Sequence, residues 1–324
     1  MDMEKLNKWM VGIDGRNSSE AVLWNIIDLA NHFKPESITF ICVFQELDLP
    51  NEIWSKFPDL QTTQMQDFGH KLSGSVSGVL DDSIEYTIEL NVGNPLTELS
   101  KKSQQPEFDL ILIGNDKNHY KLRDRVIKKS SCSVLLVPDQ KIDKLQNILM
   151  PIDHYDYSQR IASVARQFVD CYQVEKVKAL HIYQDAFHYL NLILESPYEV
   201  EEILQKRKEL DDQLQSYALY KTKEFAENHK FPGFEGEIIK MGKGVNIDMP
   251  LAKSTTNYKP DLIIIEAKGK AASSAYLLGN MTESSENGLV QSYLYIVKAK
   301  REPVGVLKSL LRLDYRAVTN LIYS

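Results

Sequence analysis

The sequence has few cysteines, and their placement excludes two classes of stabilising chemistry. Cys42, Cys132 and Cys171 are far apart and odd in number. They can therefore build neither a disulfide framework nor a Cys-x-x-Cys metal site. A reducing, cytoplasmic setting is the simpler interpretation.

Long apolar runs are also missing. The longest, such as Leu110–Ile113 and Leu262–Ile265, fall far short of the roughly 20 residues that span a bilayer. The segment Met1–Lys8 is polar and lacks the basic-then-apolar layout of a secretory signal. We expect no integral membrane segment.

Basic charge is scarce over most of the chain. The formal net charge is −7, which argues against a nucleic-acid partner. Residues 298–324 carry six basic and two acidic side chains, a net +4, so the remainder of the chain is −11. The basic tail is thus a separate feature.

Signatures of catalysis and metal binding are absent. No Gly-x-Ser-x-Gly elbow, His-Glu-x-x-His helix or phosphate-binding Gly-x-x-x-x-Gly-Lys-[Ser/Thr] loop occurs. His154 lies beside Asp153 and Asp156, but neighbouring side chains at a strand end point in different directions. His181 lies within an apolar strand and is predicted to be a packed core residue. We expect no metal site and do not favour an enzyme.

The chain does contain a weak internal repeat. Residues 9–14 read W-M-V-G-I-D and residues 148–153 read I-L-M-P-I-D, while D-L-I-L-I at 109–113 returns as D-L-I-I-I at 261–265. Each apolar strand pattern precedes a segment of helical period. Near-continuous apolar strands that alternate with helices predict parallel sheets covered on both faces.

A length of 324 residues accommodates two such units. We predict two tandem five-stranded α/β domains, doubly wound, at 1–140 and 141–300, followed by a helical tail at 301–324. The short connection near Pro138–Leu145 indicates that the domains pack together. Helices are predicted at Thr62–Val79 and at Glu199–Asn228, the latter with charges of both signs that mark a solvated face.

These patterns resemble the universal stress protein family in its tandem form, over about 9–137 and 147–297. Many members bind ATP through a loop after the fourth strand, written G-x-x-G, nine residues, G-[S/T]. The second half keeps Gly269 and Gly279 at that spacing. It departs from the pattern where the first family glycine falls on Glu266 and where the Ser/Thr falls on Asn280. A carboxylate beside a nucleotide repels phosphates unless it faces ribose hydroxyls or a cation.

The resemblance implies a nucleotide site in the second half, at the carboxyl ends of the strands. Asp153 would contact the adenosine moiety and Ile182 would pack on the base. ATP or AMP would be the ligand, and Mg²⁺ would accompany it. The full set of implied positions is Pro151, Asp153, Ile182, Gly242, Ile265, Lys268, Gly269, Gly279, Asn280, Met281 and Thr282. The alternative role for Asp153 is to cap the next helix.

The first half has lost the loop. Asp109 precedes Val134 by 25 positions, whereas Asp261 precedes Leu294 by 33. The missing eight fall between Gly114 and the helix expected around Leu122–Lys129. We therefore expect no nucleotide in the first half, whose corresponding positions are Gly12, Asp14, Val43, Gly93 and Gly114. Asn94 and Pro95 are expected to cap and begin a helix.

The leading hypothesis is a non-enzymatic stress-response module that binds a ligand or transmits a signal. One alternative is a scaffold or interaction protein with both sites degenerate, and another is a weak ATP hydrolase. The tail is expected to form a helix that packs on its own protein or on a second copy, giving a homodimer. Its alternative role is contact with an unidentified protein partner or an anionic membrane.

Overall fold

The computed structural model describes residues 6–14, 20–115, 120–152, 158–190, 200–242, 248–267 and 291–298. The strands are β1 (Lys8–Asp14), β2 (Ser37–Phe44), β3 (Glu85–Val92), β4 (Leu110–Gly114), β5 (Ser133–Val137), β6 (Asn147–Ile152), β7 (Lys176–Gln184), β8 (Glu235–Met241), β9 (Leu262–Glu266) and β10 (Tyr293–Val297). The helices are α1 (Glu20–Phe33), α2 (Asn51–Trp54), α3 (Leu60–Val76), α4 (Pro95–Lys102), α5 (Tyr120–Lys129), α6 (Ser158–Cys171), α7 (Ala186–Leu190), α8 (Val200–His229) and α9 (Asp248–Tyr258).

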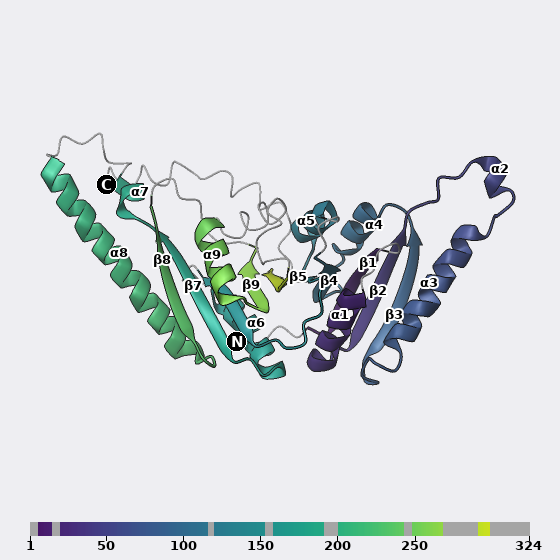
Figure 1. Ribbon diagram of the computed structural model, residues 1–324, viewed down its shortest axis with the longest axis horizontal. Helices are drawn as coiled ribbons and strands as arrows, with labels where there is room; N and C mark the ends of the chain where they lie inside the picture. The colour runs from purple at the N-terminus through teal and green to yellow at the C-terminus, as the bar shows by residue number, and fades with distance from the viewer. Residues whose placement is uncertain are drawn as a thin grey trace.

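One continuous sheet runs through the protein, in the order β3-β2-β1-β4-β5-β10-β9-β6-β7-β8. We call β1–β5 with their helices the first unit and β6–β10 with theirs the second unit. Read outward from the centre, both units have the same strand order, and within each unit all pairs are parallel. The fold is therefore the predicted α/β class with predominantly parallel strands (Figure 1).

The two units meet through an antiparallel pair of strands. Val134, Leu135 and Leu136 of β5 lie opposite Ile296, Tyr295 and Leu294 of β10. This pairing turns the two expected sheets into one and removes two exposed sheet edges.

The repeat is exact in register near the amino ends of the strands. Lys8 pairs with Ser37 in the first unit, and Asn147 pairs with Lys176, each 139 positions later, in the second. The repeated aspartates also play the same part. Asp109 Oδ2 accepts the N–H of Lys8 at 2.9 Å, and Asp261 Oδ2 accepts that of Asn147 at 2.9 Å. Each aspartate thus fixes the start of its unit's first strand.

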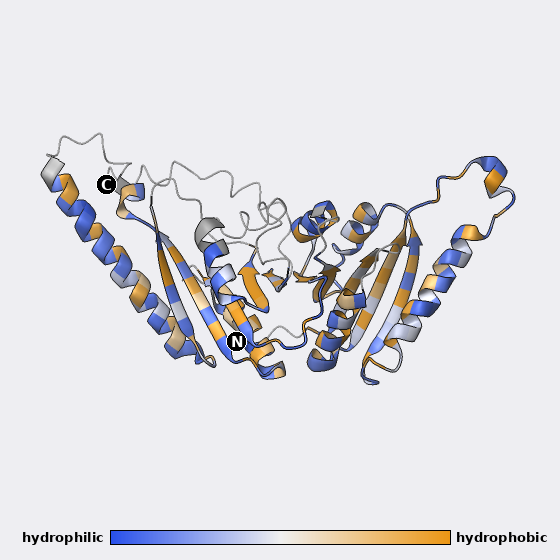
Figure 2. Ribbon diagram, in the orientation of Figure 1, coloured by the Kyte–Doolittle hydropathy of each residue, from blue (hydrophilic) through white to orange (hydrophobic). Residues whose placement is uncertain are grey.

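Helices cover both faces of the sheet, as the apolar runs predict. Helices α1, α3, α6 and α8 contribute to a core on one face, and α4, α5 and α9 contact the core on the other. Both cores extend across the two units without interruption. In Figure 2 the central strands are largely hydrophobic, whereas the outer helices α3 and α8 carry many hydrophilic residues.

A buried asparagine ties the first unit to the connection between the units. Asn25 of α1 donates to the carbonyls of Pro138 and Gln140 at 3.1 and 2.8 Å. Its own Oδ1 accepts the N–H of Ile142 at 3.0 Å. The side chain is fully buried, so the path of the connection is set by specific bonds.

Several local predictions are confirmed. The helix expected at 62–79 spans Leu60–Val76, and that expected at 199–228 spans Val200–His229. Asn94 caps α4 by accepting the N–H of Leu96 at 2.9 Å, and Pro95 is its first residue. His181 is buried, with Nδ1 3.1 Å from the Ile152 carbonyl. The predicted tail at 301–324 lies outside the described residues.

Among the helices that the structure describes, none is both long and apolar enough to cross a bilayer.

Candidate functional site

Four of the implied site residues lie in the described part of the second unit: Pro151, Ile182, Gly242 and Ile265. The others lie outside the described residues: Asp153, Lys268, Gly269, Gly279, Asn280, Met281 and Thr282.

The four described residues lie along one edge of the sheet. Pro151 is next to last in β6, Ile265 is next to last in β9, and Ile182 lies near the end of β7. Gly242 directly follows β8. These strands are neighbours in the order β9-β6-β7-β8, so the carboxyl ends of four adjacent parallel strands bring the residues together. Open α/β sheets bind ligands at this edge.

The strands at the centre of this edge separate early. β6 and β9 pair only at Ile148 with Leu262 and at Leu149 with Ile263. Their counterparts in the first unit, β1 and β4, pair over four residues, up to Gly12 with Ile113. The two missing pairs are those nearest the carboxyl ends. The strand order also reverses at this point. Strands β7 and β8 lie on one side of β6, and the next strand, β9, lies on its other side.

A single difference in the repeat accounts for the separation. Pro151 stands 139 positions after Gly12, at the same place in the I-L-M-P-I-D motif. Proline has no N–H to donate to a neighbouring strand. The pairing with β7 continues through Pro151 and Ile152, so the pairing with β9 is the one that is lost.

The last residue of β9 is acidic. Glu266 pairs with Val297 of β10 and is 8% exposed. Gly114 holds the corresponding position in β4, opposite Val137. The second unit thus has a carboxylate at this edge where the first has no side chain.

Three polar residues that the sequence analysis did not single out support the edge. Asp211 of α8 accepts the Ala186 N–H at the start of α7 and the Lys240 ammonium of β8, each at 2.7 Å. Burial by itself raises the pKa of Asp211, but these two bonds and the positive charges of Lys240 and Arg207 leave the pKa lowered overall. The Asp185 N–H donates to the Met241 carbonyl at 2.9 Å. Asp211 could not be recognised from the sequence, because it is one of many charged residues in a helix that carries both signs.

The same edge of the first unit is occupied by a buried arginine. Arg123 of α5, 5% exposed, donates to the Asn115 side chain directly after β4. The Asn115 N–H in turn donates to the Val137 carbonyl at 2.7 Å. The short connection after Gly114 therefore brings α5 against the sheet end.

The described part of the chain contains no group of three or more His, Cys, Asp or Glu residues placed to hold a metal ion.

Comparison with solved structures identifies the fold. A universal stress protein from Archaeoglobus fulgidus matches with a TM-score of 0.58 at 12% identity, over 90% of this chain and 96% of that one. A protein of unknown function from Pseudomonas aeruginosa matches with a TM-score of 0.55 at 13% identity, over 96% and 98%. No protein-family model and no curated protein matches the sequence. The chain thus has the fold of universal stress proteins over nearly its whole length.

Proposed function

We propose that this protein is a stress-response module of the universal stress type that binds an adenine nucleotide in its second unit only. The observation that carries the proposal is the early separation of β6 from β9, which has no counterpart between β1 and β4. A ligand that lies across the end of a parallel sheet needs such a gap between strands at the switch point.

The described residues of this edge suit the adenosine part of the ligand. Ile182 is half-buried at the end of β7 and offers an apolar surface to a base. Gly242, also half-buried, lets a ligand approach the backbone closely. We propose that residues 268–282 hold the phosphates. Gly269 and Gly279 would let backbone N–H groups approach the phosphates closely, and Lys268 would supply positive charge.

Glu266 sets the preference among nucleotides. A buried carboxylate at the end of β9 repels a triphosphate more strongly than a monophosphate or a nucleoside, because the repulsion grows with the ligand's charge. We therefore propose AMP or adenosine as a better ligand than ATP in the absence of Mg²⁺. With Mg²⁺ present, neutralisation of the phosphates narrows that difference.

The ligand acts by population shift. Binding favours one arrangement of the chain at this edge and thereby changes the surface that a partner contacts. No chemical step on the nucleotide is needed, so we propose a non-enzymatic role.

Calorimetric titration of the full chain with adenosine, AMP and ATP tests the proposal. We expect one site per chain, lost in Gly279→Val. Gly114→Ala is the control in the first unit, at the position that corresponds to Glu266, because a Cβ there meets only Val22 at an ordinary 3.6 Å. Glu266→Gln should tighten ATP binding about tenfold, or ~1.4 kcal/mol, and leave adenosine unchanged. Flat titrations with all three compounds would contradict the proposal.

The second candidate is a scaffold protein without a nucleotide. The buried Glu266 favours it, since an acidic side chain stands at the sheet edge that phosphates would approach. It predicts that Glu266→Gln gains no nucleotide binding at all.

A further inference from the structure

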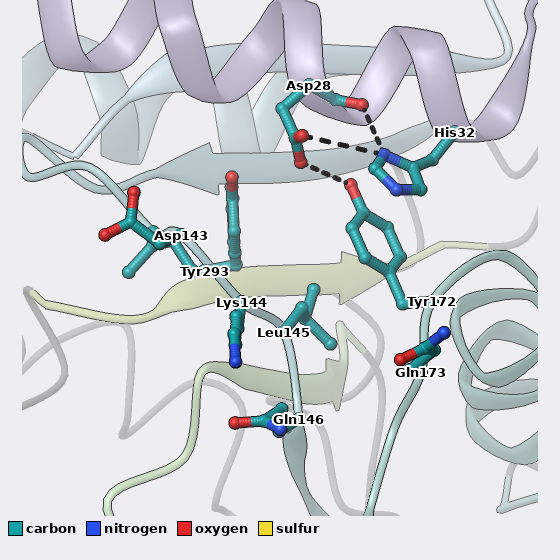
Figure 3. A pocket seen from close by; sticks show the side chains of 10 residues that line it. Asp28, His32, Asp143, Lys144, Leu145, Gln146, Tyr172, Gln173 and Tyr293 are labelled. Atoms are coloured by element: carbon teal, nitrogen blue, oxygen red, sulfur yellow. Dashed lines mark hydrogen bonds and ion pairs between the residues drawn. The ribbon is translucent and has the colours of Figure 1, made fainter.

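A cavity lies between the units, at the amino ends of the strands and away from the edge described above. It has a volume of about 210 Å³ and is lined by α1, the connection before β6, the residues after α6 and the start of β10. Figure 3 shows Asp28 and His32 of α1 facing Tyr172 across the boundary between the units, with Tyr293 of β10 pointing toward α1. At ~30 Å³ per water molecule the space equals about seven waters, so it suits a small ligand.

The polar groups of the cavity are built into the fold. The Tyr172 hydroxyl donates to Asp28 Oδ2 at 2.9 Å, and its ring stacks on that of His32 with centroids 4.0 Å apart. Asp28 is therefore held in place by the second unit, while its backbone belongs to the first.

Two oxygens in the cavity retain capacity for a donor. Asp28 Oδ1 lies 3.6 Å from His32 Nδ1, an ion-pair contact that is longer than a hydrogen bond. Tyr293 is 1% exposed, yet its hydroxyl lies 3.5 Å from the Asn25 carbonyl, longer than an ordinary O–H···O bond. A buried phenol that is this poorly paired is unusual, and in Figure 3 it faces the cavity.

The charge of the lining favours a cation. Asp28 is the carboxylate that favours a cation, and its ion-pair partner is His32. Asp143 is largely exposed and lies 4.0 Å from the ammonium of Lys141, and Lys144 adds a positive charge to the lining. Burial, with the nearby Asp28 carboxylate, raises the pKa of both Tyr172 and Tyr293, so the site resists further negative charge.

The polar residues of this cavity are not shared by the two copies of the repeat. Phe33 corresponds to Tyr172 and Gln167 to Asp28, at the offset of 139 positions. The hydroxyl and the carboxylate thus occur on one side of the boundary only, whereas the strand-start aspartates occur in both units.

We propose that this cavity binds a small organic amine in its ammonium form. The ammonium donates to Asp28 Oδ1 and to the Tyr293 oxygen, and the bound amine bridges the two units. This site is independent of the nucleotide proposed for the opposite end of the strands.

Titration of the full chain with three four-carbon compounds tests the charge class: diaminobutane, butanediol and succinate. We expect diaminobutane to bind one to one and the neutral and anionic compounds not to bind. Asp28→Asn, which keeps an acceptor for Tyr172, should weaken diaminobutane binding at least tenfold. Asp67→Asn removes the same charge from an exposed position on α3 and should leave binding unchanged, as should Gly279→Val.

Tyr293→Phe provides a second variant that preserves ring packing, and circular dichroism checks that each variant folds. Weaker diaminobutane binding in Tyr293→Phe supports the proposal. Equal binding of butanediol or succinate, binding unaffected by Asp28→Asn, or no binding of diaminobutane would each overturn it.

Discussion

At the scale of single residues, Asn25 of α1 fixes the connection between the two units, a role that its position in a helix does not predict. All three of its bonds go to the connection between the units, and the side chain itself is fully buried. Asn25→Ala should lower the free energy of unfolding by about 3 kcal/mol, since it removes three hydrogen bonds and leaves the buried Pro138 carbonyl unpaired.

Denaturant unfolding measures this cost against Asn31→Ala. Asn31 also bonds two backbone groups, the Val79 carbonyl and the Asp81 N–H, but it lies near solvent. Water can replace those bonds, so Asn31→Ala should lower the free energy of unfolding by only about 1 kcal/mol. Equal costs would contradict the account.

Lys298 predicts a measurable pH dependence. Its ammonium donates to the Ser130 carbonyl at 3.1 Å and hydroxyl at 2.8 Å, and burial lowers its pKa from 10.5 to about 8. Between these values Lys298 binds more protons in the unfolded chain than in the folded protein, so its own contribution to the free energy of unfolding rises with pH from 8 to 10.5. Lys298→Met should abolish that rise, which amounts to about 2–3 kcal/mol. Urea titrations at pH 8, 9 and 10 measure the difference between the two proteins.

At the scale of elements, the repeated aspartates predict matched effects in the two units. Asp109 and Asp261 each accept two backbone N–H groups at the start of a first strand. Asp109→Ala and Asp261→Ala should each destabilise the protein by about 2 kcal/mol. Thermal unfolding, with the exposed Asp67→Ala as control, tests this; an effect in one unit alone would show that the repeat is not equivalent there.

Strands and helices could be predicted because each carries its own apolar period. The strands at Ile38–Phe44 and Leu262–Ile265 are largely buried on both faces, and their nearly continuous apolar sequence predicts this burial. The separation of β6 from β9 could also have been found, since Pro151 replaces Gly12 in the aligned motifs. The pairing of β5 with β10 could not, because it depends on two sheet edges meeting, and neither edge carries a local signal.

The cavity between the units was equally beyond sequence reasoning. Asp28, Tyr172 and Tyr293 are far apart in the chain and belong to different elements. Each is ordinary in its own segment, and only the docking of one unit against the other brings the three together.

At the scale of the whole molecule, we expect the two units to behave as one cooperative body. Both hydrophobic cores and the sheet continue across the boundary. A protease site inserted between Asp143 and Lys144 should therefore leave the two fragments associated after cleavage. Gel filtration of the cleaved protein measures this, and elution of two separate fragments would contradict it.

The central claim is that, of two copies of one fold, only the second has the strand separation at its carboxyl edge that a nucleotide needs. Native mass spectrometry of the full chain with excess AMP tests this claim most directly. The account predicts one added nucleotide per chain, lost in Gly279→Val and kept in Gly114→Ala. Two nucleotides per chain, or none, would contradict it.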